Sequence, residues 1–230
     1  ELDENNCYHF ISISRAHNII ALFAKTTNEA YYNWTNSFTD ISKNDWFYES
    51  VRYTASAQLF IGTEATVFSP DDAMTREMIV TVLWRLAGSP VVPDENKISF
   101  RDVSTDSYAY EAIRWASMFN IIEGYGDGTF GYGDPILREQ LVTILFRFAR
   151  NYVGVDVSLA DSTNILGYSD VLQVSQGMAQ PFQWAVGARI IYGTSRTTLE
   201  PRGMATRAQV AAVFQRFSTN FMDKVPVFKT

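Results

Sequence analysis

The chain has 230 residues, 47% of them apolar and 14% aromatic, which is enough to bury a core and too much for a disordered chain. Its 19 basic and 25 acidic residues give a net charge of −6 without any basic cluster, so no nucleic-acid partner is expected. The longest apolar runs fall far short of the ~20 residues of a membrane span, and no signal-peptide pattern begins the chain. The single cysteine, Cys7, excludes a disulfide within the chain.

Residues 1–37 precede a repeated region and carry both histidines of the chain, His9 and His17. Neither a catalytic triad nor a multi-histidine metal site can therefore be assembled. We expect no catalytic residue, no metal site and no cofactor. An N-terminal amphipathic helix packed against the repeats is indicated by four residues with helical spacing, Phe10, Ile13, His17 and Ile20.

The rest of the chain contains three copies of one pattern. The copies open on Phe38-Thr39-Asp40-Ile41, Phe100-Arg101-Asp102-Val103 and Tyr168-Ser169-Asp170-Val171. A glycine follows each aspartate after 22, 22 and 23 residues, at Gly62, Gly124 and Gly193. An arginine comes 14 residues after each glycine, at Arg76, Arg138 and Arg207, and another nine residues later, at Arg85, Arg147 and Arg216.

Each copy predicts a helix, a loop and a second helix, because apolar residues recur with helical spacing on both sides of the loop. The glycine is expected to end the first helix in a left-handed conformation. One such hairpin cannot bury its apolar face alone, so the copies should pack together into an all-α fold. The predicted boundaries are 1–37 for the extension, 38–90, 98–151 and 166–219 for the copies, and 220–230 for a tail.

The order of these motifs resembles the S-layer homology domain. The second copy is most similar, with Phe100-Arg101-Asp102-Val103, Tyr108 and Gly124-Tyr125-Gly126-Asp127-Gly128-Thr129-Phe130. The resemblance implies three domains in a pseudo-threefold spindle with a central helical bundle. It also implies an extracellular, non-enzymatic module that anchors proteins of Gram-positive and related bacteria to a secondary cell-wall polymer. The recognised sugar would carry a pyruvate ketal, and the grooves would lie between neighbouring copies.

The resemblance implies a set of ligand-binding residues: Asp40, Trp46, Gly62, Arg76, Asp102, Tyr108, Gly124, Arg138, Asp170, Gly193 and Arg207. The sequence also departs from the family pattern. Only Thr206 and Gln209 can form a complete capping box, and the aromatic of Trp46 and Tyr108 is replaced by Gly177. We therefore expect unequal grooves, with those of Arg76 and Arg138 keeping an aromatic partner and that of Arg207 lacking one.

The first-turn arginines are the most informative residues, because a helix N-terminus disfavours a cation. A guanidinium suits a carboxylate ligand, and on this reading Arg76→Ala and Arg138→Ala weaken binding and hardly affect stability. The alternative is that each arginine pairs with an aspartate of the protein, Asp40, Asp102 or Asp170, and that truncation is strongly destabilising. The mid-helix arginines Arg85, Arg147 and Arg216 are expected to form structural ion pairs.

The other residues also keep two interpretations. The aspartates either accept hydrogen bonds from sugar hydroxyls or hold turns, and Trp46 and Tyr108 either stack on a sugar or fill the core. For the whole chain, the alternative to polysaccharide binding is a helical scaffold that binds a protein or forms a surface lattice. A wall hydrolase is a third, weaker hypothesis. Self-association in a surface layer is left open.

Overall fold

The computed structural model describes residues 28–93, 95 and 98–222, so the expected N-terminal helix at residues 10–20 lies outside the described part. Within it the fold is all-α, as predicted, and β structure is limited to isolated bridges between loops. The helices are α1 (Asn28–Asn33), α2 (Tyr48–Ser56), α3 (Arg76–Leu86), α4 (Tyr110–Met118), α5 (Arg138–Arg147), α6 (Leu159–Ser162), α7 (Ala179–Gly187) and α8 (Arg207–Phe217). The π-helical turns η1 (Phe148–Val153) and η3 (Ser218–Met222) extend α5 and α8, and η2 (Val171–Gln173) is a 3-10 turn.

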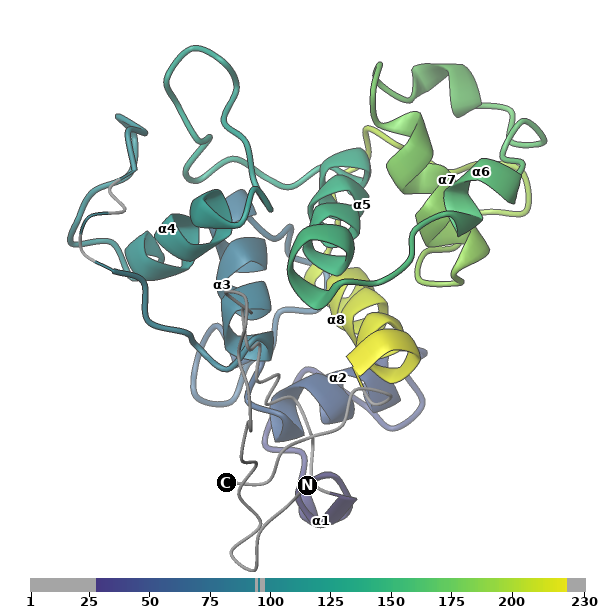
Figure 1. Cartoon of the computed structure of the whole chain (residues 1–230). Helices are drawn as coiled ribbons and strands as arrows, with labels where there is room; N and C mark the ends of the chain where they lie inside the picture. Colours follow the sequence, from purple (N-terminus) through teal and green to yellow (C-terminus); the bar gives the residue numbers. More distant parts are fainter. Residues whose placement is uncertain (1–27, 94, 96–97, 223–230) are drawn as a thin grey trace, which may run out of the picture.

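Each copy contains the expected helix pair: α2 and α3, α4 and α5, α7 and α8. The first helix of each pair packs against the second helix of another copy, namely α4 on α3, α7 on α5 and α2 on α8. Figure 1 shows α3, α5 and α8 gathered at the centre with α4, α7 and α2 outside them. The apolar faces that the helical spacing predicts are therefore covered by neighbouring copies.

The loops before the three central helices join in a closed cycle of backbone hydrogen bonds. Met74 donates its N–H to the carbonyl of Ala205 at 3.0 Å, Ala205 donates to Ile136 at 3.0 Å, and Ile136 donates to Met74 at 2.8 Å. All three residues are buried, and each lies two positions before the first-turn arginine of its copy. The cycle gives the contacts a threefold order; the spindle shape stays a prediction.

The end of the first helix differs from the sequence-based expectation. The left-handed residues are Gln58, Asn120 and Arg189, with φ of 57°, 52° and 56°, and each lies four residues before the motif glycine. Gly62, Gly124 and Gly193 are required for a different reason. A Cβ at Gly124 would collide with the carbonyl oxygen of Thr129 and the ring of Phe100, and the other two glycines are equally crowded. The glycines allow the loop to fold back closely on itself.

Candidate functional site

The first-turn arginines occupy the first positions of α3, α5 and α8 and are only 5–7% exposed. Each guanidinium reaches across to the loop of another copy and donates from Nε and Nη2 to two backbone carbonyls. The bonds join Arg76 to Phe130 (3.0 Å) and Glu123 (3.1 Å), Arg138 to Leu199 (2.8 Å) and Tyr192 (2.8 Å), and Arg207 to Phe68 (2.6 Å) and Ile61 (2.7 Å). The arginines thus brace the interfaces between copies.

This geometry differs from the alternative in which each arginine pairs with an aspartate. Within the described residues none of the three forms an ion pair with an aspartate, and their hydrogen-bond partners are carbonyl oxygens. The Nη1 group of each has no hydrogen-bond partner in the same part of the chain. Burial lowers the pKa of all three guanidinium groups below the usual value for arginine. Each is therefore a partly desolvated cation with a free donor.

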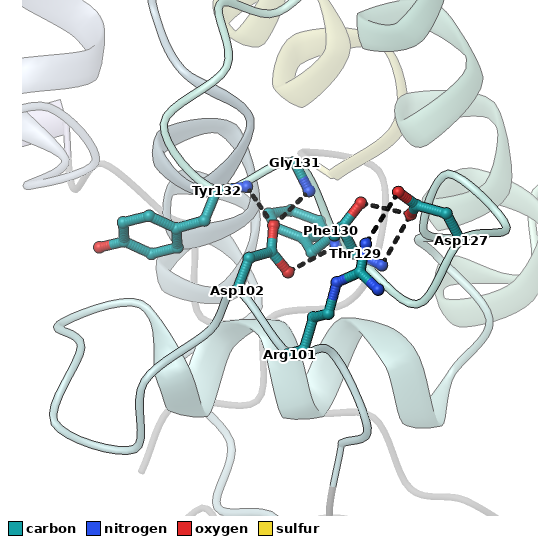
Figure 2. A network of polar contacts seen from close by, with 7 residues as sticks. All are labelled: Arg101, Asp102, Asp127, Thr129, Phe130, Gly131 and Tyr132. Atoms are coloured by element: carbon teal, nitrogen blue, oxygen red, sulfur yellow. Dashed lines mark hydrogen bonds and ion pairs between the residues drawn. The ribbon is translucent and has the colours of Figure 1, made fainter.

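The motif aspartates hold the same loops from within their own copies. Asp102 accepts the backbone N–H groups of Phe130, Gly131 and Tyr132 at 2.8–2.9 Å, as Figure 2 shows. Burial alone would raise the pKa of Asp102, but the three backbone donors outweigh it, and the pKa lies below the ordinary value. Equivalent bonds run from Phe68 and Ser69 to Asp40, and from Leu199 and Glu200 to Asp170. These contacts favour the turn-holding interpretation.

Three grooves lie between the copies, and we name each by its first-turn arginine. The Arg207 groove, ≈360 Å³, is lined by Gly62, Thr63, Met78, Thr81, Val82, Arg85, Tyr108 and their neighbours. The Arg138 groove, ≈320 Å³, is lined by Trp46, Tyr192, Gly193, Thr194, Gln209, Val213, Arg216 and their neighbours. The Arg76 groove, ≈130 Å³, is lined by Glu123, Gly124, Tyr125, Gln140, Thr143, Ile144, Arg147 and Met178. The three linings are equivalent positions of the repeat.

Each groove is shared by all three copies, which corrects the expected order of the grooves. Tyr108 lines the Arg207 groove and Trp46 lines the Arg138 groove. The third copy contributes Met178, the neighbour of Gly177, to the Arg76 groove. The expectation that the Arg207 groove lacks the aromatic was wrong. Arg207 comes from the third copy, but the aromatic in its groove, Tyr108, precedes α4 of the second copy, which packs on α3 of the first.

The mid-helix arginines also line the grooves, a role that the sequence interpretation missed. An α-helix rotates by about 100° per residue, so a spacing of nine residues places these arginines on the opposite side of the helix from the first-turn arginines. Arg85 therefore faces the Arg207 groove although it shares α3 with Arg76. Only Arg147 forms the expected ion pair within the described residues, with Glu123 at 2.7 Å. Arg85 donates to the carbonyl of Leu59 at 3.2 Å, and Arg216 donates to that of Ile190 at 3.3 Å.

The rims of the two larger grooves carry solvent-exposed aromatic side chains. Trp46 is 66% exposed and Tyr108 is 60% exposed, so neither fills the core. Both lie two residues before a first helix begins, Trp46 before α2 and Tyr108 before α4. Burial, with a smaller contribution from Glu77, raises the pKa of Tyr108 to about 12.

No group of three or more histidine, cysteine, aspartate or glutamate side chains suited to a metal ion occurs in the described ranges. Among the helices that the structure describes, none is long and apolar enough to cross a membrane. The fold and the grooves thus define a helical repeat module with arginine-lined grooves between its copies, two of which carry an exposed aromatic at the edge.

Residues 37–77, 99–142 and 167–211 match the S-layer homology domain, one match in each copy. These matches cover more than half of the chain, so the chain belongs to the S-layer homology family. Its three copies form a cell-surface anchoring module.

Similar proteins are much longer than this chain. An endoglucanase of Bacillus sp. (strain KSM-635) is 27% identical over 194 residues, 84% of this chain and 20% of that protein. A cellulosome-anchoring protein of Acetivibrio thermocellus is 24% identical over 162 residues, 67% of this chain and 34% of that protein. Cell surface glycoprotein 1 of the same species is 27% identical over 150 residues, 59% of this chain and 6% of that protein. The matched region is thus a minor part of each relative.

Proposed function

We propose that the chain attaches proteins to the bacterial cell wall by binding an acidic polysaccharide, of the pyruvylated secondary-polymer class, in its inter-copy grooves. The observation that supports this proposal is the buried arginine at each groove, which has a free Nη1 group and no ion-pair partner within the described residues. A carboxylate placed there would gain charge-assisted hydrogen bonds from an already ordered guanidinium. On this proposal the module acts outside the cell and has no catalytic role.

The Arg207 and Arg138 grooves are best suited to such a ligand. Each combines the first-turn arginine with a second arginine, Arg85 or Arg216, on the facing helix. The exposed ring of Tyr108 or Trp46 then offers an apolar surface to the C–H face of a pyranose. This combination of two cations and one aromatic matches a sugar that carries a carboxylate.

Long-range electrostatics oppose this ligand, because the chain carries a net charge of −6. At physiological salt the Debye length is about 8 Å, so distant carboxylates are largely screened from a ligand in the groove. The two nearby arginines therefore determine whether an anion binds. Binding should weaken as salt is added, but less steeply than for an exposed patch, since the first-turn arginines are buried.

The aspartates and glycines of the motif have a supporting role in this proposal. Asp40, Asp102 and Asp170 use their carboxylate oxygens to hold the loops, and none of them lines a groove. Gly62, Gly124 and Gly193 line the grooves and let the backbone approach closely. We therefore assign ligand contact to the arginines and aromatics, and loop geometry to the aspartates.

Cosedimentation with purified cell-wall sacculi tests the proposal. The chain should sediment with untreated sacculi and stay in the supernatant after the secondary polymer has been removed by acid. The double variant Arg85→Gln with Arg216→Gln should lose most of the binding while remaining folded, because both arginines lie at the groove surface. The matched control is Arg202→Gln, an exposed arginine that also donates to a carbonyl, that of Gln173 at 3.2 Å. Equal sedimentation with and without the polymer would favour the scaffold alternative.

A further inference from the structure

The Arg76 groove differs from the other two in its charge. Its second arginine, Arg147, is paired with Glu123, whose carboxylate oxygen lies 2.7 Å from Nη2. The residues equivalent to Glu123, directly before the motif glycine, are Ile61 and Tyr192. No acidic side chain lines the Arg207 or Arg138 groove. The Arg76 groove is thus the one of these three that contains its own carboxylate.

The Arg76 groove is also the smallest and has a different rim. Its volume is ≈130 Å³, against ≈320 and ≈360 Å³ for the other two. The ring of Tyr125 covers the guanidinium of Arg76 at 4.8 Å from its centroid, at a position where the other copies have Thr63 and Thr194. Met178 replaces the exposed aromatic ring of the other grooves. Its charge and its small volume both disfavour a sugar carboxylate here.

We propose that Glu123 is a built-in counterion that closes the Arg76 groove to acidic saccharides, so that the module has two acceptor grooves. The Glu123 carboxylate pairs with Arg147, one of the two cations that a ligand carboxylate would meet in this groove, and it repels a second anion. The Glu123 side chain is 71% exposed, so solvent screens this repulsion. Its loss at a separation of several ångströms then corresponds to a gain in affinity on the order of tenfold, between the values for water and for a surface dielectric. This inference rests on the proposed function and assigns Glu123 as the residue that makes the grooves unequal.

The test uses Glu123→Gln and a readout that separates the grooves. The backbone amides of Gly62, Gly193 and Gly124 lie in the Arg207, Arg138 and Arg76 grooves, so their NMR shifts report each groove individually. The probe is a methyl hexoside that carries a pyruvate ketal. In the unmodified protein Gly62 and Gly193 should shift at probe concentrations that leave Gly124 unchanged. In Glu123→Gln, Gly124 should also shift, with an affinity about tenfold higher than before.

The matched control is Asp127→Asn. Asp127 belongs to the same copy, is exposed and pairs with Arg101 at 3.2 Å, but does not line the groove. This variant loses the same charge and should leave Gly124 unresponsive. If Gly124 gains affinity equally in both variants, the effect comes from net charge and the role of Glu123 is refuted. It is refuted as well if Gly124 of the unmodified protein binds as tightly as the other two glycines, or if Glu123→Gln gains nothing.

Sodium pyruvate, titrated in parallel, separates this inference from the proposed function. It carries the carboxylate without the sugar ring. If the hexoside shifts no glycine in either protein, the proposed sugar class is wrong. The role of Glu123 is then still supported if pyruvate shifts Gly124 in Glu123→Gln and not in the unmodified protein, and it is overturned if pyruvate shifts Gly124 in neither or in both.

Discussion

The Nε group of Arg207 donates to the carbonyl oxygen of Phe68 at 2.6 Å and so joins the last copy to the first across 139 residues of sequence. Arg76 and Arg138 make the equivalent bonds between the other copies. The first-turn arginines at the grooves are therefore part of the three interfaces that join the copies to one another. If the proposed function is correct, binding and stability are coupled at these positions.

Arg207→Ala should be strongly destabilising. It removes two hydrogen bonds from a charged donor and leaves the carbonyls of Phe68 and Ile61 without that partner, a loss of about 3–5 kcal/mol. Urea denaturation followed by circular dichroism measures the change. Arg202→Ala, at an exposed arginine, should cost less than about 1 kcal/mol. Similar effects of the two substitutions would show that the hydrogen bonds from Arg207 to the first copy contribute little to stability.

Gly124→Ala should destabilise the second copy, although Gly124 does not have a positive φ. Its new methyl group would collide with the Thr129 carbonyl and the Phe100 ring, and crowding of this kind costs about 1–3 kcal/mol or more. Gly167→Ala is the control, because a Cβ there meets no atom within 4 Å. Thermal melts of the two variants should differ by several degrees. Coincident melts would contradict the close-approach explanation.

The stability contributed by Asp102 should depend on pH. Its pKa is lowered in the folded protein, so its contribution is complete above the unfolded value of about 3.9 and is lost as pH falls through the lower folded value. The free energy of unfolding of Asp102→Asn, measured by urea titration between pH 7 and about pH 2, should therefore be below that of the unmodified protein at neutral pH and approach it in acid. Asp71→Asn, at an exposed aspartate, serves as the control. A difference that is constant across this range would contradict the assignment.

The repeat register determined most of what could be predicted. The spacing of aspartate, glycine and arginine identified three copies, and helical spacing placed a helix pair in each, as the structure confirms. The capping box of Thr206 and Gln209 is also confirmed. These features depend on residues near one another in sequence, where a single period determines which side chains share a face.

The composition of the grooves could not be read from one copy. Trp46 and Arg138 are 92 residues apart and belong to different copies, yet they line the same groove. Pairing each arginine with the aromatic of its own copy therefore assigned the missing aromatic to the wrong groove. The carbonyl partners of the arginines could not be predicted either, because every residue type has the same backbone carbonyl. The nine-residue arginine spacing did carry a signal, since it places the pair on opposite helix faces.

Trp46→Ala and Tyr108→Ala should each abolish strong binding in one groove and leave the other intact. Both rings are mostly exposed, so their removal should change the free energy of unfolding by less than about 0.5 kcal/mol. Loss of a stacking ring should weaken binding in the affected groove by about 1–3 kcal/mol, by analogy with base stacking on aromatic side chains. Calorimetry with a pyruvylated hexoside should report two strong sites in the unmodified protein, one in each single variant, and none in the double variant. Met178→Ala is the control, because Met178 takes the place of the Trp46 or Tyr108 ring in the Arg76 groove, and it should leave both strong sites unchanged. Retention of two strong sites in Trp46→Ala would mean that the tryptophan does not contact the sugar.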